Sequence, residues 1–526
     1  MLLAQVSPPH DGLGATDFTV VFLYLAGTLA IAVVSARKSH STEEFFLGGR
    51  RMPWFAVGLS ILASLLSTIS YTATPGETIK YGIANFMSLL AMPFSIAVVF
   101  GMWVPFFMRL RLTSAYEYLE LRFNYPARLL GAILFVLLRL GWMGVVVYTS
   151  AKALSAMTNY SIEEIIILVG IFATIYTAVG GIRAVIWTDV VQGLTLVLGA
   201  VITICYIGFV TGTTPADWWT SAGEHTRPPI ASLDITESRT ALNFIIGGFF
   251  WVICTHASDQ VVLQRYFSTD SLKSARNSFI VNIVTDIVMM TLLALCGLAL
   301  LSFYTEYPSH LGGGDIHPSH DADKVFPYFI SHQLPAGIGG LILAALIAAA
   351  MSSIDSGVNS VSAVVTTDLR GPGRTKSAAS ITVARLLTLI VGALATTIAY
   401  GVAQIAQSGG NNIVELMPKA FNMFLGPLAG LFFIGMFVPR CSGWPAVIAT
   451  AMGIITSVIW SYWKELFDTP WAPTFNFAVA APCLLTVFIG FLLSLFLRNV
   501  KPSQYAWRAV VRGTNGRTEN GKTNDE

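Results

Sequence analysis

Charged side chains are scarce in this chain: Asp, Glu, Lys and Arg together make up 11% of its 526 residues, whereas a soluble globular protein has about 25%. Hydrophobic residues reach 54%, and the mean hydropathy is +0.66. The formal net charge is only +2, so the charge balance gives no indication of a nucleic-acid partner. The composition excludes an ordinary soluble domain and indicates an all-α polytopic protein of the lipid bilayer.

Sequence signals of several other protein classes are also missing. The five cysteines form no CxxC pair and no metal-ligand spacing, so neither a disulfide framework nor a transition-metal site is expected. There is no GxxxxGK[ST] phosphate loop, which argues against a nucleotide-driven pump. The first 16 residues lack the basic stretch of a cleavable signal peptide, so the first helix should itself direct insertion. We expect the cysteines to be small buried hydrophobic residues: Cys205, Cys254, Cys296, Cys441 and Cys483.

Long apolar stretches dominate what is present. A spanning helix needs about 20 mostly apolar residues, and thirteen segments qualify: 17–36, 53–79, 84–108, 128–157, 162–180, 184–210, 241–266, 274–303, 335–367, 377–402, 413–438, 442–463 and 475–498. We divide the chain accordingly into an N-terminal segment with the leading helix (1–52), a five-helix set (53–210), an outer loop (211–240), a second five-helix set (241–438), two peripheral helices (439–498) and a disordered tail (499–526).

Lys and Arg are distributed unevenly between the loops. One set of alternate loops, together with the tail, carries 22 of them, and the opposite loops carry four. Because basic residues are retained in the cytoplasm, we expect an outer N-terminus and a cytoplasmic C-terminus in a plasma membrane, and the compact loops favour a bacterial inner membrane. The His- and Asp-rich loop 304–334 is expected to be solvated, with a metal site as the lesser alternative. Residues 116–123 should form a short interfacial helix.

Polar residues interrupt two of the predicted helices. A cluster of serines and threonines in 63–74 precedes Pro75 and Gly76, and the run 255–260 (Thr-His-Ala-Ser-Asp-Gln) interrupts the seventh segment. Each interrupted segment is the first of its five-helix set. Such a correspondence is typical of inverted-repeat transporters, in which unwound carbonyls bind cations. The alternative is that both are merely kinked packing helices.

The ninth predicted helix carries a stripe of small and polar residues. Ala349, Ser352, Ser353 and Ser356 follow the spacing of one helix face, and Asp355 borders it. At membrane depth such groups normally face a bundle interior or a water-filled cavity. We therefore interpret the stripe as a cation site, with hydrogen bonding of the serines to the preceding turn as the alternative.

These passages resemble the sodium:solute symporter family, which has a leucine-transporter-like inverted-repeat fold. Residues 258–266 (Ser-Asp-Gln-Val-Val-Leu-Gln-Arg-Tyr) look like the family's signature after its broken sixth core helix, and 180–192 look like its fourth-to-fifth core connection. The Ser352-Ser353 stretch looks like the eighth core helix, and 45–50 and 116–122 also fit. The likeness covers about 17–498. It implies about 13 transmembrane helices, a 5+5 inverted repeat with broken first and sixth core helices, and function as a monomer.

The resemblance also implies cation sites. The main sodium site would use backbone carbonyls of Ala63, Leu66 and Ala349 and the hydroxyls of Ser352 and Ser353. A second cation site would use Asp189, Ser352, Asp355 and Ser356. Asp355 stands where a hydroxyl is expected, so it would either strengthen that site or carry a proton. The alternative for Asp189 is an ion pair with Arg183 or a neighbouring helix.

The resemblance is less informative about the solute. Sugar-transporting relatives have a glutamine in the first core helix and a lysine in the seventh, where this sequence has Ser70 and Asp286. Asp286 would need a partner or a proton inside the membrane, and Arg139, Lys152 and Lys419 are the candidate partners. The predicted pocket consists of Ser67, Ser70, Tyr71, Thr74, Trp251, Asp259, Gln260 and Asp286.

We therefore predict a transporter rather than an enzyme: alternating-access symport of Na⁺ with a small polar organic solute such as a sugar, sialic acid or carboxylate. The first alternative is proton coupling or exchange on the same fold, with Asp355, Asp286 or Asp189 titrating. A membrane enzyme has less support because His256 is a lone candidate catalytic group. A solute sensor also has less support, because the residues after Arg498 are too few for an output domain.

Overall fold

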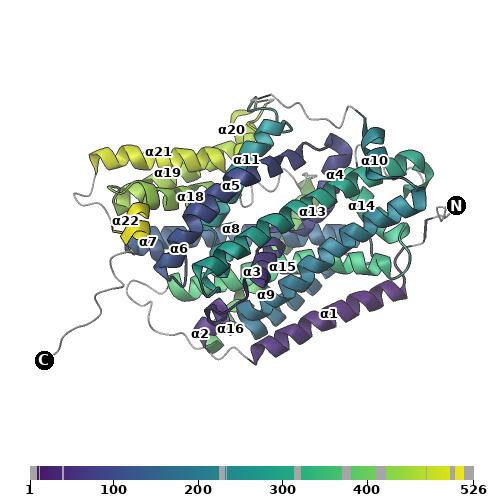
Figure 1. Ribbon diagram of the computed structural model, residues 1–526, viewed down its shortest axis with the longest axis horizontal. Helices are drawn as coiled ribbons and strands as arrows, with labels where there is room; N and C mark the ends of the chain where they lie inside the picture. Colours follow the sequence, from purple (N-terminus) through teal and green to yellow (C-terminus); the bar gives the residue numbers. More distant parts are fainter. Residues whose placement is uncertain are drawn as a thin grey trace.

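The computed structural model describes residues 9–10, 12–37, 41–223, 232, 234–312, 321–369, 381–409, 422–469, 471–497 and 504–513. The regular elements of these residues are helices (Figure 1). The first half contains α1 (Ala15–Ala36), α2 (Thr42–Leu47), η1 (Gly48–Arg50), α3 (Trp54–Leu65), α4 (Thr68–Tyr81), η2 (Asn85–Ala91), α5 (Met92–Val98), η3 (Val99–Trp103), α6 (Val104–Leu110), α7 (Glu117–Arg122), α8 (Tyr125–Ser155), α9 (Ile162–Thr211) and α10 (Pro215–Ala222). The second half contains α11 (Ala241–Ser258), α12 (Gln260–Phe267), α13 (Leu272–Glu306), η5 (Pro308–His310), α14 (Ala322–His332), α15 (Ile338–Asp368), α16 (Ile381–Gly409), α18 (Met423–Phe437), α19 (Gly443–Ser461), α20 (Trp463–Phe467), η8 (Phe475–Phe477), α21 (Ala480–Phe496) and α22 (Trp507–Arg512).

Each of the thirteen predicted segments overlaps a helix of the structure. Ten helices of the described residues are long and apolar enough to cross a membrane, or eleven when the bent pair α3 and α4 is taken as one span. The number is below thirteen because α9 runs through two predicted segments, with non-helical backbone only at Gly181. In addition, α18 has only 15 residues and is too short to be counted as a span. The all-α polytopic fold class is confirmed.

Both predicted helix interruptions are present. The axis bends by 65° between α3 and α4, where Leu66 and Ser67 adopt extended backbone conformations. The second break lies at Asp259, which is extended between α11 and α12. Pro75 does not cause the first break, as it lies inside α4. Each break leaves helix-end carbonyls and N–H groups without their intrahelical partners, which is the local condition for binding an ion or polar group.

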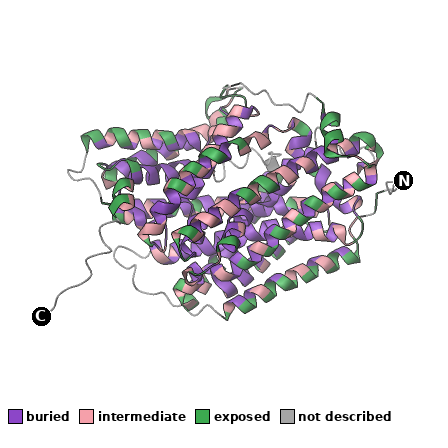
Figure 2. Cartoon of the chain, viewed as in Figure 1, coloured by how far each residue is buried: buried purple, intermediate pink, exposed green. Residues whose placement is uncertain are grey.

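Helix α15 occupies the centre of the molecule. Every residue from Ala348 to Val364 is buried, and α15 packs against α1, α3, α8, α9 and α16. Small residues allow this close approach: a Cβ on Gly357 would lie 2.5 Å from the sulfur of Met143 in α8. In Figure 2 the buried residues fill the middle, while α1 and α21 at opposite edges expose one face each. The predicted cation stripe is therefore entirely enclosed by other helices.

Four peripheral predictions need correction. Loop 304–334, predicted to be solvated, contains α14, which packs against α4, although residues 313–320 lie outside the described ranges. Residues 117–122 form α7, but this helix is largely buried and not merely interfacial. The tail 499–526 includes the short helix α22, which packs against α6. Cys205 is exposed on α9, whereas the other four cysteines are buried.

Candidate functional site

The ligands predicted for the main sodium site meet where α3 ends. The hydroxyl of Ser352 donates to the backbone carbonyl of Ala63 over 2.8 Å and lies 3.1 Å from the carbonyl of Ala349. The adjacent Ser353 hydroxyl is buried and has no hydrogen-bond partner among the described residues. Leu66 follows Ala63 by three residues, at the point where α3 stops. The contact between Ser352 and Ala63 thus joins the broken helix to α15 at oxygen-rich positions.

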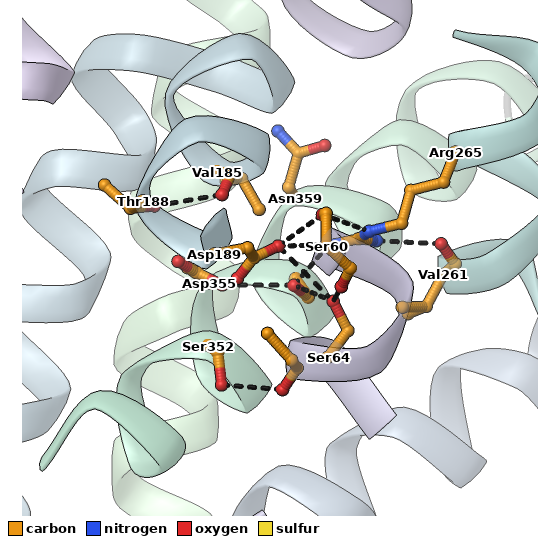
Figure 3. A network of polar contacts seen from close by, with 12 residues as sticks. Ser60, Ser64, Val185, Thr188, Asp189, Val261, Arg265, Ser352, Asp355 and Asn359 are labelled. Atoms are coloured by element: carbon orange, nitrogen blue, oxygen red, sulfur yellow. Dashed lines mark hydrogen bonds and ion pairs between the residues drawn. The ribbon is translucent and has the colours of Figure 1, made fainter. Parts of the chain in front are cut away.

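A second polar cluster lies next to this contact, and its centre is an ion pair (Figure 3). The Arg265 guanidinium of α12 lies 3.0 Å from a carboxylate oxygen of Asp189 in α9, and both side chains are fully buried. Ser60 donates to the same carboxylate oxygen, while the Arg265 Nε–H donates to Ser60 over 2.7 Å. Ser64 and Ser356 share a 2.8 Å hydrogen bond beside them. Residues from four elements therefore converge on one enclosed point.

Asp355 adds a second carboxylate to this cluster. Tyr176 of α9 donates its hydroxyl to one Asp355 oxygen, and Ser356 donates to the other over 3.1 Å. Within the described cluster, two carboxylates thus accompany a single guanidinium. Of the predicted second cation site, Asp189, Asp355 and Ser356 are brought together, whereas Ser352 is engaged with Ala63.

Asp189 pairs with a neighbouring helix, as one form of the predicted alternative had it, and not with Arg183. Arg183 donates toward the carbonyl of Gly48 at 3.5 Å, and Arg265 pairs with Asp189 instead. Sequence reasoning also missed three further members of the cluster: Ser60, Ser64 and Tyr176. Arg265 belonged to the family-like signature 258–266, which was the available signal, but the spacing along the chain gave no indication that it meets α9.

A cavity of about 320 Å³ opens beside the first helix break. Three of the predicted pocket residues line it: Ser70 of α4, Trp251 of α11 and Asp286 of α13. Most of the other lining residues are aliphatic residues, methionines or glycines. The sequence reasoning did not identify the amide, aromatic and imidazole groups among the rest, which are Asn85, Asn282, Asn422, Asn476, Trp142, Phe244, Phe475 and His256. The volume is that of a small-molecule site.

Five predicted pocket residues lie outside this cavity. Asp259 forms an ion pair with Arg139 and lines only a neighbouring cavity of about 20 Å³. The side-chain oxygen of Gln260 accepts the backbone N–H of Ala115 over 2.8 Å. The Tyr71 hydroxyl donates to the carbonyl of Leu196 over 3.1 Å. The remaining two residues are buried on α4 or at its start: Ser67 and Thr74.

A set of arginine contacts links several helices at one end of the bundle. Arg122 of α7 donates to backbone carbonyls between α18 and α19: Gly435, Val438, Pro439 and Cys441, over 2.8–3.2 Å. Arg128 at the start of α8 pairs with Asp368 at the end of α15 over 2.7 Å and with Glu120. These contacts fasten α7, α8, α15 and the α18–α19 connection together.

Comparison with known proteins gives one matching family description. The sodium:solute symporter family model matches residues 45–453. A sodium/sialic acid symporter of Aliivibrio fischeri is 30% identical, over 92% of this chain and 94% of that protein. A sodium/sialic acid symporter of Proteus mirabilis is 31% identical, over 87% and 91% of the two chains.

Solved structures agree with the observed architecture. The substrate-bound, outward-open structure of a Na⁺-coupled sialic acid symporter covers 93% of this chain and 99% of its own, with a TM-score of 0.77 and 29% identity. The nucleobase-cation-symport-1 family transporter Mhp1, in a closed conformation, covers 87% and 94% with a TM-score of 0.54 and 14% identity. The second likeness concerns the fold alone.

Proposed function

This chain belongs to the sodium:solute symporter family and is a sodium-coupled symporter of small organic solutes, and we propose that the α3–α15 contact is where it binds sodium. The ligands would be the carbonyls of Ala63, Leu66 and Ala349 and the hydroxyls of Ser352 and Ser353. The single observation that carries this assignment is Ser353, whose buried hydroxyl lacks a partner among the described residues. Buried polar groups are nearly always hydrogen-bonded, and a bound cation would satisfy this one.

We propose that sodium couples to the solute through the broken helix. A cation held by α3 and α15 would fix the orientation of α4, which starts at Thr68 just after the break and contributes Ser70 to the large cavity. Solute would then bind more tightly in the presence of sodium than in its absence. By linkage, solute would increase sodium affinity by the same factor, typically equivalent to about 1–3 kcal/mol.

The orientation in the membrane follows as part of this proposal. The cavity is lined by η2 and by Phe475 and Asn476 of η8, which begin two predicted spans at the ends that adjoin loops poor in Lys and Arg. The arginine contacts of α7 lie in the opposite, basic set of loops. We therefore propose an outer N-terminus, a cavity that faces outward and a closed cytoplasmic end, in a bacterial inner membrane, with the monomer as the working unit.

The second cation site has a different status because Arg265 already pairs with Asp189. We propose that an ion could bind at Asp189, Asp355 and Ser356 only after the guanidinium moves away. The alternative of proton coupling gains support from Asp355, since the described cluster has one more carboxylate than guanidinium. The variant Asp355→Ser restores a hydroxyl at this position. If the cluster binds a cation, this variant should keep sodium-driven uptake. If Asp355 carries a proton, it should abolish the proton dependence of uptake.

The sodium assignment is tested by thermal unfolding of the detergent-purified full chain in NaCl and in KCl of equal ionic strength. We expect sodium to stabilise the wild type, by about 2.7 kcal/mol at a concentration 100 times the Kd. Ser353→Ala should remove most of this sodium-specific shift. The matched control is Ser362→Ala, because Ser362 is also buried on α15 but donates to its own helix at Val358. A folded wild type without a sodium shift, or an equal shift in Ser353→Ala, would refute the assignment.

A further inference from the structure

We propose that the transported solute carries a positively charged nitrogen, which binds to the carboxylate of Asp286 in the 320 Å³ cavity. The proposal rests on the proposed function, because it takes this cavity as the solute site. It narrows the solute from any small organic molecule to an amine, with or without a carboxylate elsewhere on the same molecule.

Among the described residues, the cavity wall carries a carboxylate and neither lysine nor arginine. Asp286 lines the cavity from α13. The ion pairs formed among the described residues do not include Asp286. Of the predicted partners, Arg139 pairs with Asp259, Lys152 lies near Asp323, and Lys419 is outside the described residues.

His256 is the other titratable group in the cavity wall. Its imidazole has Nδ1 2.6 Å from the Tyr266 hydroxyl and packs edge-on against Phe279, so it is already engaged with these two neighbours. A carboxylate held at membrane depth without a countercharge is costly. A solute that brings a positive charge offsets this cost, so the binding energy depends on the amine.

The remaining lining of the cavity also suits an amine. Trp251, Phe244 and Phe475 line the same cavity, and aromatic faces attract ammonium groups through cation–π interactions. Four asparagine amides in the wall can hydrogen-bond hydroxyl or carbonyl groups of the solute. A carboxylate, an aromatic set and neutral amides together form a site for an amine with polar substituents.

An acid without an amine is disfavoured by the same geometry. Its carboxylate would meet Asp286, while the guanidinium next to the cavity belongs to Arg139 and is held by Asp259 at 3.2 Å. Asp259 also accepts the backbone N–H of Val261 over 2.9 Å, so it keeps one partner if Arg139 turns away. A solute with both charges could therefore bind Asp286 and Arg139 at its two ends, whereas an acid alone leaves Asp286 unpaired.

The test uses four six-membered-ring probes that differ in charge: piperidine, pipecolate, cyclohexanecarboxylate and cyclohexanol. Binding to the purified full chain in NaCl is followed by tryptophan fluorescence, since Trp142 and Trp251 line the cavity, and by thermal stabilisation. We expect both amines to bind and to lose about ten-fold or more affinity in Asp286→Asn. The matched control is Thr285→Val, because Thr285 is next to Asp286 in the chain and its hydroxyl donates to a carbonyl within α13. This control should bind the amines as the wild type does.

The possible outcomes distinguish failure of the amine inference from failure of the sodium assignment. Equal binding of the acid or the alcohol, no binding of either amine, or unchanged amine affinity in Asp286→Asn would overturn the amine inference. In all three cases a sodium shift that depends on Ser353 would leave the sodium assignment standing. Loss of that sodium shift in folded wild type would instead remove the proposed function itself.

Discussion

Asp189 and Arg265 are both completely enclosed, so their ion pair differs from a surface salt bridge. Water cannot take over the role of a missing partner at such a site. Removing one member of a buried pair typically costs about 3–5 kcal/mol, because the other charge is left uncompensated. Ser60 ties the pair to α3, since it accepts from Arg265 and donates to Asp189.

We therefore expect Asp189→Asn to lower the free energy of unfolding by about 3–5 kcal/mol, measured by denaturant or thermal unfolding in detergent. The double variant Asp189→Asn/Arg265→Gln should lose less than the sum of the two single losses, because neither charge is then left alone. Asp468→Asn is the control, since Asp468 is exposed and Asn tolerates its left-handed backbone. Additive losses in the double variant would contradict a direct interaction.

Single residues also show where sequence reasoning stops. Ser67, Tyr71 and Thr74 share one stripe of α4, and that stripe is buried against protein, as the Tyr71 contact with Leu196 shows. Ser70 lies on another side of the same helix and lines the cavity. Composition identifies a polar helix near the solute site. It does not reveal which side of the helix faces the cavity, because that depends on the positions of α9 and α13.

At the scale of elements, α15 receives its N-terminal cap from a different helix. The carboxylate of Asp17 in α1 accepts the backbone N–H groups of Gly337 over 2.8 Å and of Gly340 over 2.7 Å. Gly337 has a φ of +87°, and a Cβ on Gly340 would lie 2.4 Å from the Cα of Asp17. Helix α1 is thus fixed to the start of the helix that carries the sodium ligands.

Asp17→Ala should therefore destabilise the protein by about 1–2 kcal/mol, the usual cost of a lost N-cap, in thermal unfolding. Asp17→Asn retains an acceptor oxygen and should lose less. Both variants should still show the sodium-specific shift, because Asp17 contacts only the start of α15, well before Ser353 along that helix. An alanine variant as stable as the wild type would mean that the contact between α1 and α15 contributes little.

Both helix breaks lie within the polar runs that the sequence indicated, 63–74 and 255–260, although the sequence did not single out the residues at which the helices stop. The cluster of polar residues in 63–74, followed by Pro75 and Gly76, correctly indicated an interruption. The actual break at Leu66 and Ser67 comes well before Pro75, which stays inside α4. A proline in a helix interior removes one backbone hydrogen bond, yet α4, which packs against α13, continues through Pro75. Tertiary contacts therefore determine at which residue the helix is interrupted.

At the scale of the whole molecule, Arg122 joins α7 to the connection between α18 and α19. Its guanidinium satisfies four backbone carbonyls, and Cys441 is buried at this contact. We expect Arg122→Ala to loosen the closed end and to increase labelling of Cys441 by a hydrophilic maleimide several-fold, as measured by mass spectrometry. Cys296, buried between α13 and α9, is an internal reference that should stay unlabelled. Equal labelling of both cysteines would indicate general unfolding instead.

The overall organisation was accessible to sequence reasoning because hydropathy and local motifs repeat along the chain. The Asp189–Arg265 pair was not, since its members are 76 positions apart in the chain, with α10 and α11 between them. The same holds for the cavity wall, which combines residues as distant as Ser70 and Asn476. Local sequence patterns predict the helices, whereas the binding sites depend on contacts between helices that are distant in the sequence.

The lone carboxylate in the cavity has an electrical consequence. If an amine without a compensating acid group binds Asp286, each turnover carries the charge of the solute as well as that of sodium. Each positive charge moved inward through 100 mV releases about 2.3 kcal/mol, so two charges would release about 4.6 kcal/mol. The membrane potential would then act directly on the charged solute. With one sodium ion per turnover, the charge moved per molecule of solute would be twice that obtained with a zwitterion, which brings no net charge of its own.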